Sequence, residues 1–301
     1  MFFVIGHLIG KLSFTNLARY ARNDTRTYFL VGGTNYCIAM CAAIIWALLS
    51  RGEIVFEWPA ILLGAYEGFQ YQIMFIVLFA TISLGGMAVA STINHFSIIV
   101  PVIASMVLWG EVPPTARIIG TIVILISMPL VGLDAQRRAR SRGMSSFAFP
   151  ALMAVSFVML GTGQLAAKAF VELRVDSAPA DYAVFLFAAA TLSTLLTWPL
   201  VVRLANREIA SDKIKWRKLQ SANRRLAIFV GIMLGLSNFI QNILLVEALA
   251  ILPATLIFPL TAASFLLLVT LADIVIWKQK FSSATVTGIA LAGVGLVLIN
   301  I

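Results

Sequence analysis

The sequence is poor in the residues that most enzyme and metal sites need. Its 301 residues include two cysteines, two histidines and 13 acidic residues, and only 12% of the chain is charged. Cys37 and Cys41 lie one helical turn apart, but no histidine or further cysteine completes a metal-ligand set. The chain also lacks a GxxxxGK[ST] nucleotide loop, a metal-binding signature and a catalytic triad. We therefore expect no enzyme, no cofactor and no metal, and ATP-driven work would need a partner.

Apolar residues take up most of the chain. Hydrophobic residues make up 60% of it and the mean hydropathy is +0.96, values outside the range of soluble domains. Apolar stretches of about 18–25 residues recur, each long enough to cross ~30 Å of hydrocarbon as a helix. These stretches are continuous rather than alternating, which argues against a β-barrel. We predict an all-α integral membrane protein with ten transmembrane helices, at roughly 1–18, 28–49, 59–81, 85–109, 115–133, 148–170, 182–203, 226–247, 252–277 and 283–301.

The chain repeats itself along its length. Residues 109–120 align with 277–288 at an offset of 168, and residues 6–11 align with 163–168 at an offset of 157. An internal repeat in a membrane protein is typical of transporters, whose binding site lies between the repeats. The prediction therefore has a first repeat, a basic linker and a second repeat, at 1–133, 134–147 and 148–301. The first span would begin about nine residues before Met1, so we expect a start upstream rather than a shortened helix.

The basic residues predict an orientation in the membrane. The net charge is +9, but 17 of the 22 lysines and arginines fall in the connections after odd-numbered spans, which is typical of topology signals rather than of nucleic-acid binding. Only Arg51, Arg117 and Arg174 fall in the even-numbered connections. The positive-inside rule places the basic loops 134–147 and 204–225 in the cytoplasm and both termini outside the cell membrane. Five spans per repeat is an odd number, so the two halves must be inverted relative to each other.

At this point the chain resembles a known family. The five-plus-five repeat, and an apolar helix that ends in Trp109-Gly110-Glu111 before a small-residue helix with Gly120, are similar to the drug/metabolite transporter superfamily, EamA type. The resemblance covers nearly the whole chain. It implies a secondary transporter of small metabolites with a central cavity lined by helices 1, 3, 4, 6, 8 and 9. It also implies cytoplasmic termini, the reverse of what the charges predict.

Polar residues inside the apolar spans are the candidate substrate and coupling site, because each is costly in lipid and therefore faces protein or water. Glu67, Gln70 and Tyr71 share one face of helix 3 through their i, i+3, i+4 spacing. Helix 8, the repeat partner of helix 3, carries Asn238, Gln241 and Asn242 at the same i, i+3, i+4 spacing. The remaining candidates lie in helices 8, 4, 1 and 6 and are Asn238, Gln241, Asn242, Asn94, His95, Lys11, Gln164 and Lys168.

Each candidate also has a purely structural interpretation. The amides can bond across to a neighbouring helix, a contact worth about 0.6 kcal/mol on average. Lys11 and Lys168 can extend toward the membrane interface, and His95 can be a packing residue. Glu67 is a carboxyl group that needs either a proton or a partner, so it is the candidate proton-coupling group. The alternative for Glu67 is a structural ion pair with Lys11 or Lys168.

The function that we predict from the sequence is secondary transport of a small organic solute by alternating access, with coupling to protons as an extension. The alternative is a lipid-carrier flippase subunit or a membrane scaffold protein. The expected partners are a small-molecule solute, the lipid bilayer and protons, without nucleic acid. We expect a monomer, with a homodimer as the alternative. Gly6-x3-Gly10 and Gly231-x3-Gly235 permit close helix approach, which ordinary packing inside the chain explains equally well.

Overall fold

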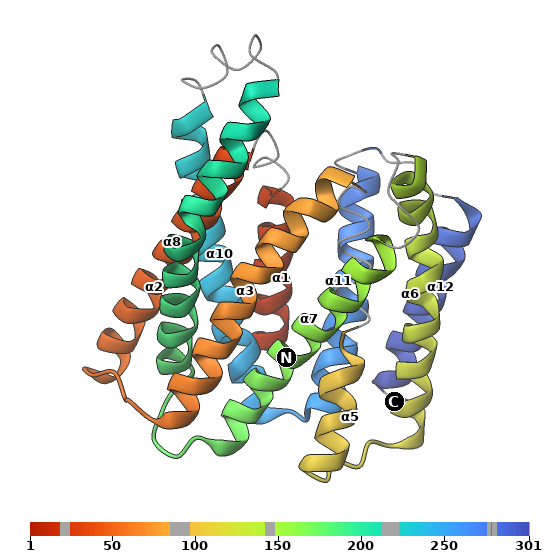
Figure 1. Cartoon of the computed structure of the whole chain (residues 1–301). Coiled ribbons are helices and arrows are strands. Elements are labelled where there is room, and N and C mark those ends of the chain that lie inside the picture. The colour runs from red at the N-terminus through yellow and green to blue at the C-terminus, as the bar shows by residue number, and fades with distance from the viewer. Residues whose placement is uncertain are drawn as a thin grey trace. The chain divides into compact units, whose positions relative to one another are not determined.

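The computed structural model describes residues 1–18, 25–84, 97–141, 148–211, 223–275, 278 and 282–300, and these residues form helices and no strand (Figure 1). The prediction of an all-helical protein of membrane type is thereby confirmed, while ten spans and the repeat stay predictions. The helices are α1 (Phe2–Ala18), α2 (Thr25–Arg51), α3 (Trp58–Leu84), α5 (Ile99–Leu108), α6 (Thr115–Ser141), α7 (Ala148–Leu173), α8 (Pro179–Ser211), α10 (Asn223–Ile251), α11 (Ala254–Val275) and α12 (Ser283–Ile299).

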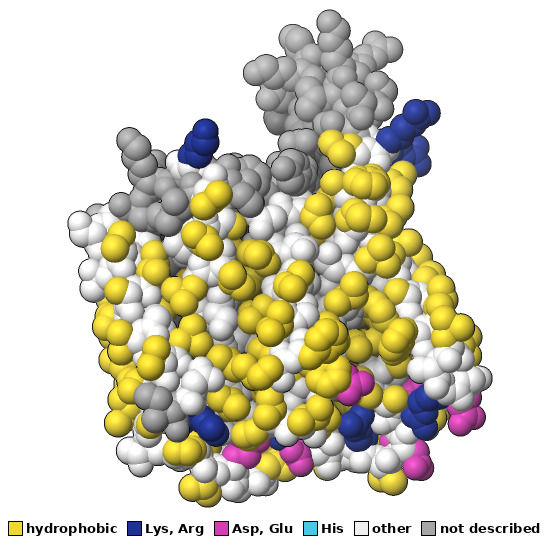
Figure 2. Space-filling view, turned by 180° about the vertical axis from the view of Figure 1, so that it is seen from behind, with side chains coloured by type: hydrophobic (Ala, Val, Ile, Leu, Met, Phe, Trp, Pro, Cys, Tyr) yellow, Lys and Arg dark blue, Asp and Glu magenta, His cyan; other side chains and the backbone are white. Residues whose placement is uncertain are grey.

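Several of these helices have the length and composition of membrane spans. Five described segments qualify, and they are Phe29–Arg51, Ala154–Leu173, Pro179–Pro199, Arg224–Ile251 and Ala254–Ala272. Large apolar side chains such as Phe2, Leu49 and Leu196 are exposed along the helices. In Figure 2 hydrophobic side chains cover much of the visible face, and the acidic and basic ones lie toward its lower and upper edges. Exposed apolar surface of this extent fits a lipid environment rather than water.

The two basic connections are shorter than predicted. α6 continues to Ser141 and α8 continues to Ser211, so the first parts of the segments 134–147 and 204–225 are helical rather than loops. α10 already begins at Asn223. Hydropathy marks where a chain leaves the lipid, whereas the helix itself continues for as long as its residues favour it. The segment after Leu133 is rich in alanine, glutamine and arginine, which are good helix formers.

The chain divides into two compact units, and each unit combines segments of both predicted repeats. The α2–α8 unit comprises residues 2–72 and 169–246. The α6–α12 unit comprises residue 1, residues 73–168 and residues 247–301. Three helices, α3, α7 and α10, therefore change from one unit to the other along their length.

In the α6–α12 unit, α6 and α12 lie side by side (Figure 1). A Cβ atom on Gly120 would lie 2.8 Å from the carbonyl oxygen of Gly295, and a Cβ atom on Gly295 would lie 2.8 Å from that of Gly120. The two backbones therefore touch where neither residue has a side chain, as in other closely packed membrane helices. α11 packs against α12 and α5 in the same unit. α6 and α12 are the fifth helices of the two predicted repeats.

In the α2–α8 unit, glycine pairs bring five helices together. Gly64 and Gly68 of α3 face α8, where a Cβ atom on Gly68 would lie 2.0 Å from the Leu186 carbonyl oxygen. Gly231 and Gly235 of α10 face α2 in the corresponding way. The Gly-x3-Gly motif at 231–235 is therefore used inside the chain, and so is the motif at 6–10, whose glycines face α10. These contacts hold α1, α2, α3, α8 and α10 around one core.

Candidate functional site

A cluster of polar side chains, all buried except the half-buried Tyr71 and Gln241, lies inside the α2–α8 unit, on five apolar helices. We call it the polar core, and it consists of His7 (α1), Asn35 and Tyr36 (α2), Glu67 and Tyr71 (α3), Tyr182 (α8) and Asn238, Gln241 and Asn242 (α10). The glycine contacts of α3 and α10 bring these helices close enough for their side chains to bond to one another. The cluster is therefore built by tertiary packing rather than by any one helix.

Glu67 is a deeply buried carboxyl group whose described hydrogen-bond partner is a tyrosine. Its side chain is 5% exposed, and the Tyr182 hydroxyl donates a hydrogen bond to its Oε2 atom. Tyr182 is held in place by stacking on Phe170, with ring centroids 4.6 Å apart. Tyr71 lies one turn further along α3. The ion pairs found among the described residues involve other carboxylates, so Glu67 has no basic partner there.

A directed chain of hydrogen bonds runs from Tyr71 through two amides of α10. The Tyr71 hydroxyl donates to Asn242 Oδ1 at 2.7 Å. Asn242 Nδ2 donates both to Asn238 Oδ1 at 2.9 Å and to the Asn238 backbone carbonyl at 2.8 Å. A backbone carbonyl can only accept, so this second bond fixes which way the Asn242 amide points. The direction of the chain from Tyr71 to Asn238 is therefore determined.

The chain ends at an amide that is not fully paired. Asn238 Nδ2 donates to Asn35 Oδ1 at 3.4 Å. The Nδ2 atom of Asn35 is buried and has no acceptor among the residues that the structure describes. Such a donor is uncommon in a packed interior, where polar groups are nearly always bonded. Asn35 is therefore a position where the oxygen of a bound molecule would complete the hydrogen bonding.

Two further bonds hold α1 and α2 against this chain. His7 donates from Nδ1 to the carbonyl oxygen of Gln241 at 2.7 Å, which leaves Nε2 of the neutral ring as an acceptor. The Tyr36 hydroxyl donates to the carbonyl oxygen of Tyr71 at 3.0 Å. Lys11 lies on α1 one turn after His7 and is half-buried. The polar core thus combines hydrogen-bond acceptors and donors from five helices, α1, α2, α3, α8 and α10.

Beside the polar core, Gln72 is fully used in binding α3 to α8. Its Nε2 donates to Thr197 Oγ1 at 2.8 Å, and its Oε1 accepts from Thr194 Oγ1 at 2.8 Å. Thr197 in turn donates to the Ser193 backbone carbonyl, and the one Thr194 proton is shared between Gln72 Oε1 and the Ala190 backbone carbonyl. Because both ends of this amide are satisfied within the protein, we regard Gln72 as a structural link.

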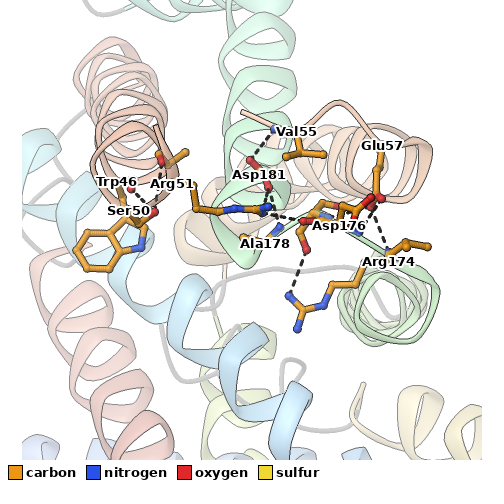
Figure 3. A network of polar contacts seen from close by, with 12 residues as sticks. Trp46, Ser50, Arg51, Val55, Glu57, Arg174, Asp176, Ala178 and Asp181 are labelled. Carbon is orange, nitrogen blue, oxygen red and sulfur yellow. Dashed lines mark hydrogen bonds and ion pairs between the residues drawn. The ribbon is translucent and has the colours of Figure 1, made fainter. Parts of the chain in front are cut away.

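Figure 3 shows a second network, at the helix ends of the α2–α8 unit, where Glu57 binds the turn that follows α7. Its carboxylate accepts from the N–H groups of Val175, Asp176 and Ser177, at 3.3, 2.7 and 3.0 Å, and from the Ser177 hydroxyl. These bonds, the Ser177 hydroxyl first, lower the pKa of Glu57 from 4.5 to about 2, because they favour the charged form. Glu57 therefore joins the α2–α3 connection to the α7–α8 connection.

Asp181 makes a similar link from the first turn of α8 (Figure 3). Its side chain is fully buried and accepts from the N–H of Val55 at 3.0 Å and from the N–H of Ala178 at 2.7 Å. Arg51, at the end of α2, lies 3.4 Å from the same carboxylate and donates to the Asp176 carbonyl oxygen at 2.7 Å. The carboxylate thus caps α8 and pairs with an arginine at once.

Glu111 has a comparable role in the α6–α12 unit. Gly110 adopts a φ of 66°, and the Glu111 N–H bonds back to the Ser105 carbonyl oxygen at 3.2 Å. This is the arrangement that ends many helices, and it explains the glycine between Trp109 and Glu111. It also aims the Glu111 side chain at a defined neighbour.

That neighbour is the start of α11, where the first N–H groups have no partner within the helix. Glu111 accepts from the N–H groups of Ala254 and Thr255 at 3.0 and 2.9 Å, and from the Lys168 ammonium at 2.9 Å. Burial of Glu111 opposes ionisation, but the bonds from Thr255, Lys168 and Ala254 outweigh it and lower its pKa. The Lys168 ammonium also lies 5.8 Å from the centre of the Trp109 ring.

The structure places the predicted site residues unevenly. Glu67 and Tyr71 meet Asn238, Gln241 and Asn242 in the polar core, and Gln70 is buried on the same helix, α3. Lys11 belongs to the same unit, whereas Gln164 and Lys168 belong to the α6–α12 unit. Asn94 and His95 lie outside the described residues.

The structure pairs Lys168 with a carboxylate other than Glu67. Its side chain is 4% exposed, and its ammonium lies 2.9 Å from Glu111. Gln164, one turn earlier, has a buried Oε1 atom without a partner among the described residues. The buried ammonium group of Lys168 needs a carboxylate partner such as Glu111, since desolvation of an unpaired charge is very costly.

Sequence reasoning missed several residues of these networks. Asn35 and Tyr36 interrupt an apolar span in the same way as Asn94, so the criterion that selected Asn94 could have found them. Tyr182 gave no such signal, because a tyrosine near the start of an apolar span is also typical of a membrane interface. Glu111 entered the prediction only as part of the Trp109-Gly110-Glu111 motif, since nothing in the sequence places it next to residues 254–255.

Bilayer-length apolar helices around a buried polar core define this chain as an all-helical membrane protein. A solved structure described only as the crystal structure of a protein has a similar fold, with a TM-score of 0.67 at 18% sequence identity. The similarity covers 99% of this chain and 98% of that chain, and at such low identity it shows the fold alone. No family model and no curated protein matches the sequence.

Proposed function

We propose that this protein is a secondary transporter of a small organic solute, related to the drug/metabolite transporter superfamily, and that Glu67 couples it to protons. The observation that carries the proposal is the polar core, in which Glu67 bonds to Tyr182, and Tyr71 bonds to the α10 amides, inside apolar helices. An ionisable residue within a membrane span is costly, and it usually marks a solute or proton pathway.

Two features of the polar core favour solute binding over a purely structural role. The structural link made by Gln72 shows that amides here can be fully satisfied, whereas Asn35 Nδ2 is left without an acceptor among the described residues. Glu67 lies next to tyrosines instead of a lysine or arginine, so nothing described holds it permanently ionised. A network with a purely structural role would be more stable if Asn35 Nδ2 had an acceptor and Glu67 had a basic partner.

The packing supports the predicted relation between the two repeats. Gly64 and Gly68 bring the third helix of the first repeat onto the second helix of the other, α8. Gly231 and Gly235 do the same for the third helix of the second repeat, α10, and for α2. Reciprocal contacts of this kind are expected of inverted repeats, which transporters use for alternating access.

The proposal is tested with purified protein in sealed vesicles, to which a panel of radiolabelled amino acids, sugars, nucleobases and amines is offered with and without a pH gradient. We expect at least one solute to accumulate only when the gradient is imposed. Glu67→Gln keeps the size of the side chain but cannot carry the charge, so it should abolish gradient-driven accumulation.

Glu53→Gln is the matched control, because it makes the same change at an exposed residue outside the helices. This variant should accumulate the solute as the unchanged protein does. If Glu67→Gln is correctly folded and still accumulates the solute with the same dependence on the gradient, Glu67 is not the coupling group. If no solute in the panel crosses faster than in protein-free vesicles, the transport proposal itself is wrong.

A further inference from the structure

The guanidinium group of Arg117 is a charge that the described residues leave unpaired. Arg117 lies in the first turn of α6 and is half-buried, and its Nε atom is buried without an acceptor among those residues. It takes no part in the ion pairs that join Arg51 to Asp181 and Lys168 to Glu111. Removing a charge from water without a partner is costly. Arg117 therefore needs an anion that the described part of the chain does not supply.

The other two arginines of the even-numbered connections are both engaged within the protein. Arg51 pairs with the buried carboxylate of Asp181. Arg174 donates to the carbonyl oxygen of Ser177 at 3.5 Å. Of these three arginines, Arg117 is the one whose side chain has no hydrogen-bond or ion-pair partner among the described residues. Its charge is therefore available to a ligand, whereas theirs hold connections together.

The start of α6 adds hydrogen-bond donors beside this charge. The Pro114 carbonyl oxygen accepts from the Arg117 N–H at 2.9 Å, and the N–H groups of Thr115 and Ala116 at the helix end have no acceptor within the helix. Side chains in a helix lean toward its N-terminus, so the Arg117 side chain leans toward these two N–H groups. Glu111, the nearest acidic residue in the sequence, is already bound to the start of α11. A guanidinium beside free N–H groups favours an anion with several oxygens.

The surface next to Arg117 is apolar and exposed. α6 and α12 lie side by side (Figure 1), and the exposed large apolar side chains near the start of α6 and along this pair include Ile118, Ile119, Ile122, Ile126, Val294 and Val297. Trp109 and Arg117 stand on either side of the short connection between α5 and α6, as residues at a membrane surface often do. An anion that binds at Arg117 thus has hydrocarbon-binding surface directly beside it.

We propose that Arg117 and the start of α6 bind the phosphate group of an anionic phospholipid, whose acyl chains lie along the exposed apolar face of α6 and α12. The planar guanidinium fork matches two oxygens of a phosphate, and the isoleucines beside it match the acyl chains. An anionic lipid is favoured over a zwitterionic one, because it carries no ammonium group of its own to pair with its phosphate. This lipid site is independent of whether the protein moves a solute.

The site is tested with the full-length protein in detergent, which is titrated with phosphatidylglycerol while native mass spectrometry resolves each lipid-bound species. We expect a first phosphatidylglycerol to bind at lower lipid concentration than any further one. Phosphatidylcholine with the same acyl chains should bind more weakly, and diacylglycerol, which has the acyl chains but no phosphate, more weakly still. Soluble glycerol 1-phosphate in large excess should not displace the first lipid, because it has no acyl chains.

Variants of Arg117 separate this site from general adhesion of lipid. Arg117→Gln should weaken binding of the first phosphatidylglycerol about tenfold or more, the effect of losing a hydrogen bond to a charged group. Arg117→Lys keeps the charge but not the planar fork, so its affinity should fall between those of the unchanged protein and Arg117→Gln. Arg224→Gln is the matched control, because it removes the same charge from an exposed arginine in the first turn of α10 and should leave the first affinity unchanged.

A first affinity for phosphatidylglycerol that is the same in Arg117→Gln, or that Arg224→Gln lowers equally, overturns the site. Displacement by glycerol 1-phosphate would reveal a site for soluble phosphates, and diacylglycerol binding as tightly as phosphatidylglycerol would reveal an apolar contact alone. Either result overturns the lipid assignment. If Arg117→Gln does not fold, Arg117→Lys decides, since an affinity equal to that of the unchanged protein would contradict recognition by the guanidinium fork. No transport is measured, so the outcome is separate from that of the proposed function.

Discussion

Single carboxylates in this protein act according to their surroundings. Glu57 and Glu111 receive several N–H bonds at helix ends, and these bonds lower the pKa of both groups. Glu67 accepts from one hydroxyl group, that of Tyr182, deep inside apolar helices, and has no such set of donors among the described residues. A carboxylate therefore binds the backbone N–H groups of a turn or a helix start in two places, and forms the centre of the proposed transport site in a third.

At the residue scale, Glu57→Gln should destabilise the protein in a pH-dependent way. The pKa of Glu57 is lowered from 4.5 to about 2 in the folded state, so folding favours the charged form. Its contribution to stability is complete above pH 4.5 and is lost as the pH falls toward 2. We expect the variant to have a lower Tm than the unchanged protein at neutral pH, with a difference that shrinks on acidification.

The measurement is thermal unfolding of detergent-purified protein over a series of pH values. Glu53→Gln serves as the control, since Glu53 is exposed in the same connection and makes no described contact with the turn at 175–177. A Tm difference for Glu57→Gln that stays constant down to the most acidic pH would contradict this account of the turn.

At the scale of elements, close helix contacts rather than helix propensity position the polar core. Gly68 sits against the backbone of α8, directly after Glu67 in the sequence. Because the nearest atom is a backbone carbonyl oxygen, α8 cannot yield by rotating a side chain. The register between α3 and α8, and with it the contact between Glu67 and Tyr182, depends on the missing Cβ atom.

Gly68→Ala should therefore force α3 away from α8 and lower the stability by about 1–3 kcal/mol, the usual cost of overpacking. Gly293→Ala is the matched control, because a Cβ atom on Gly293 of α12 would meet nothing within 4 Å. There, alanine should be neutral or should stabilise the helix by up to about 1 kcal/mol. Thermal unfolding of both variants in the same detergent distinguishes them, and equal effects on Tm would refute the close packing of α3 on α8.

At the scale of the whole molecule, the even-numbered connections are joined in pairs. Glu57 and Asp181 join the connection before α3 to the one before α8, and Glu111 joins the connection before α6 to the start of α11. Each link ties a connection of the first predicted repeat to one of the second. All four connections belong to the side that the charges place outside the cell.

The orientation can be tested with single cysteines in a Cys37→Ala, Cys41→Ala background. Ser141→Cys, at the end of α6 and within the basic segment 134–147, should resist a membrane-impermeant thiol reagent in intact cells and react once the cells are permeabilised. Glu53→Cys, at an exposed site in an even-numbered connection, should react in intact cells. The reverse pattern would place the termini in the cytoplasm, as the family resemblance implies.

The sequence by itself determined the helical class, most of the helix positions and one half of the polar core. Long apolar runs leave the backbone no option but to bond within a helix in lipid, so the spans follow from composition. The spacing of Glu67 and Tyr71, and of Asn238 and Asn242, follows from the helical repeat. Helix ends were less predictable, because α6 and α8 continue past the point where the chain becomes polar.

Only the tertiary structure decided which polar groups meet. Tyr182 reaches Glu67, Asn35 reaches Asn238 and Glu111 reaches the start of α11 across separations of more than a hundred residues. No local pattern encodes these meetings, since they depend on where two helices cross and on glycines that allow the backbones to touch. The partner of a buried charge is therefore a property of the packed fold, even where the charge itself is evident in the sequence.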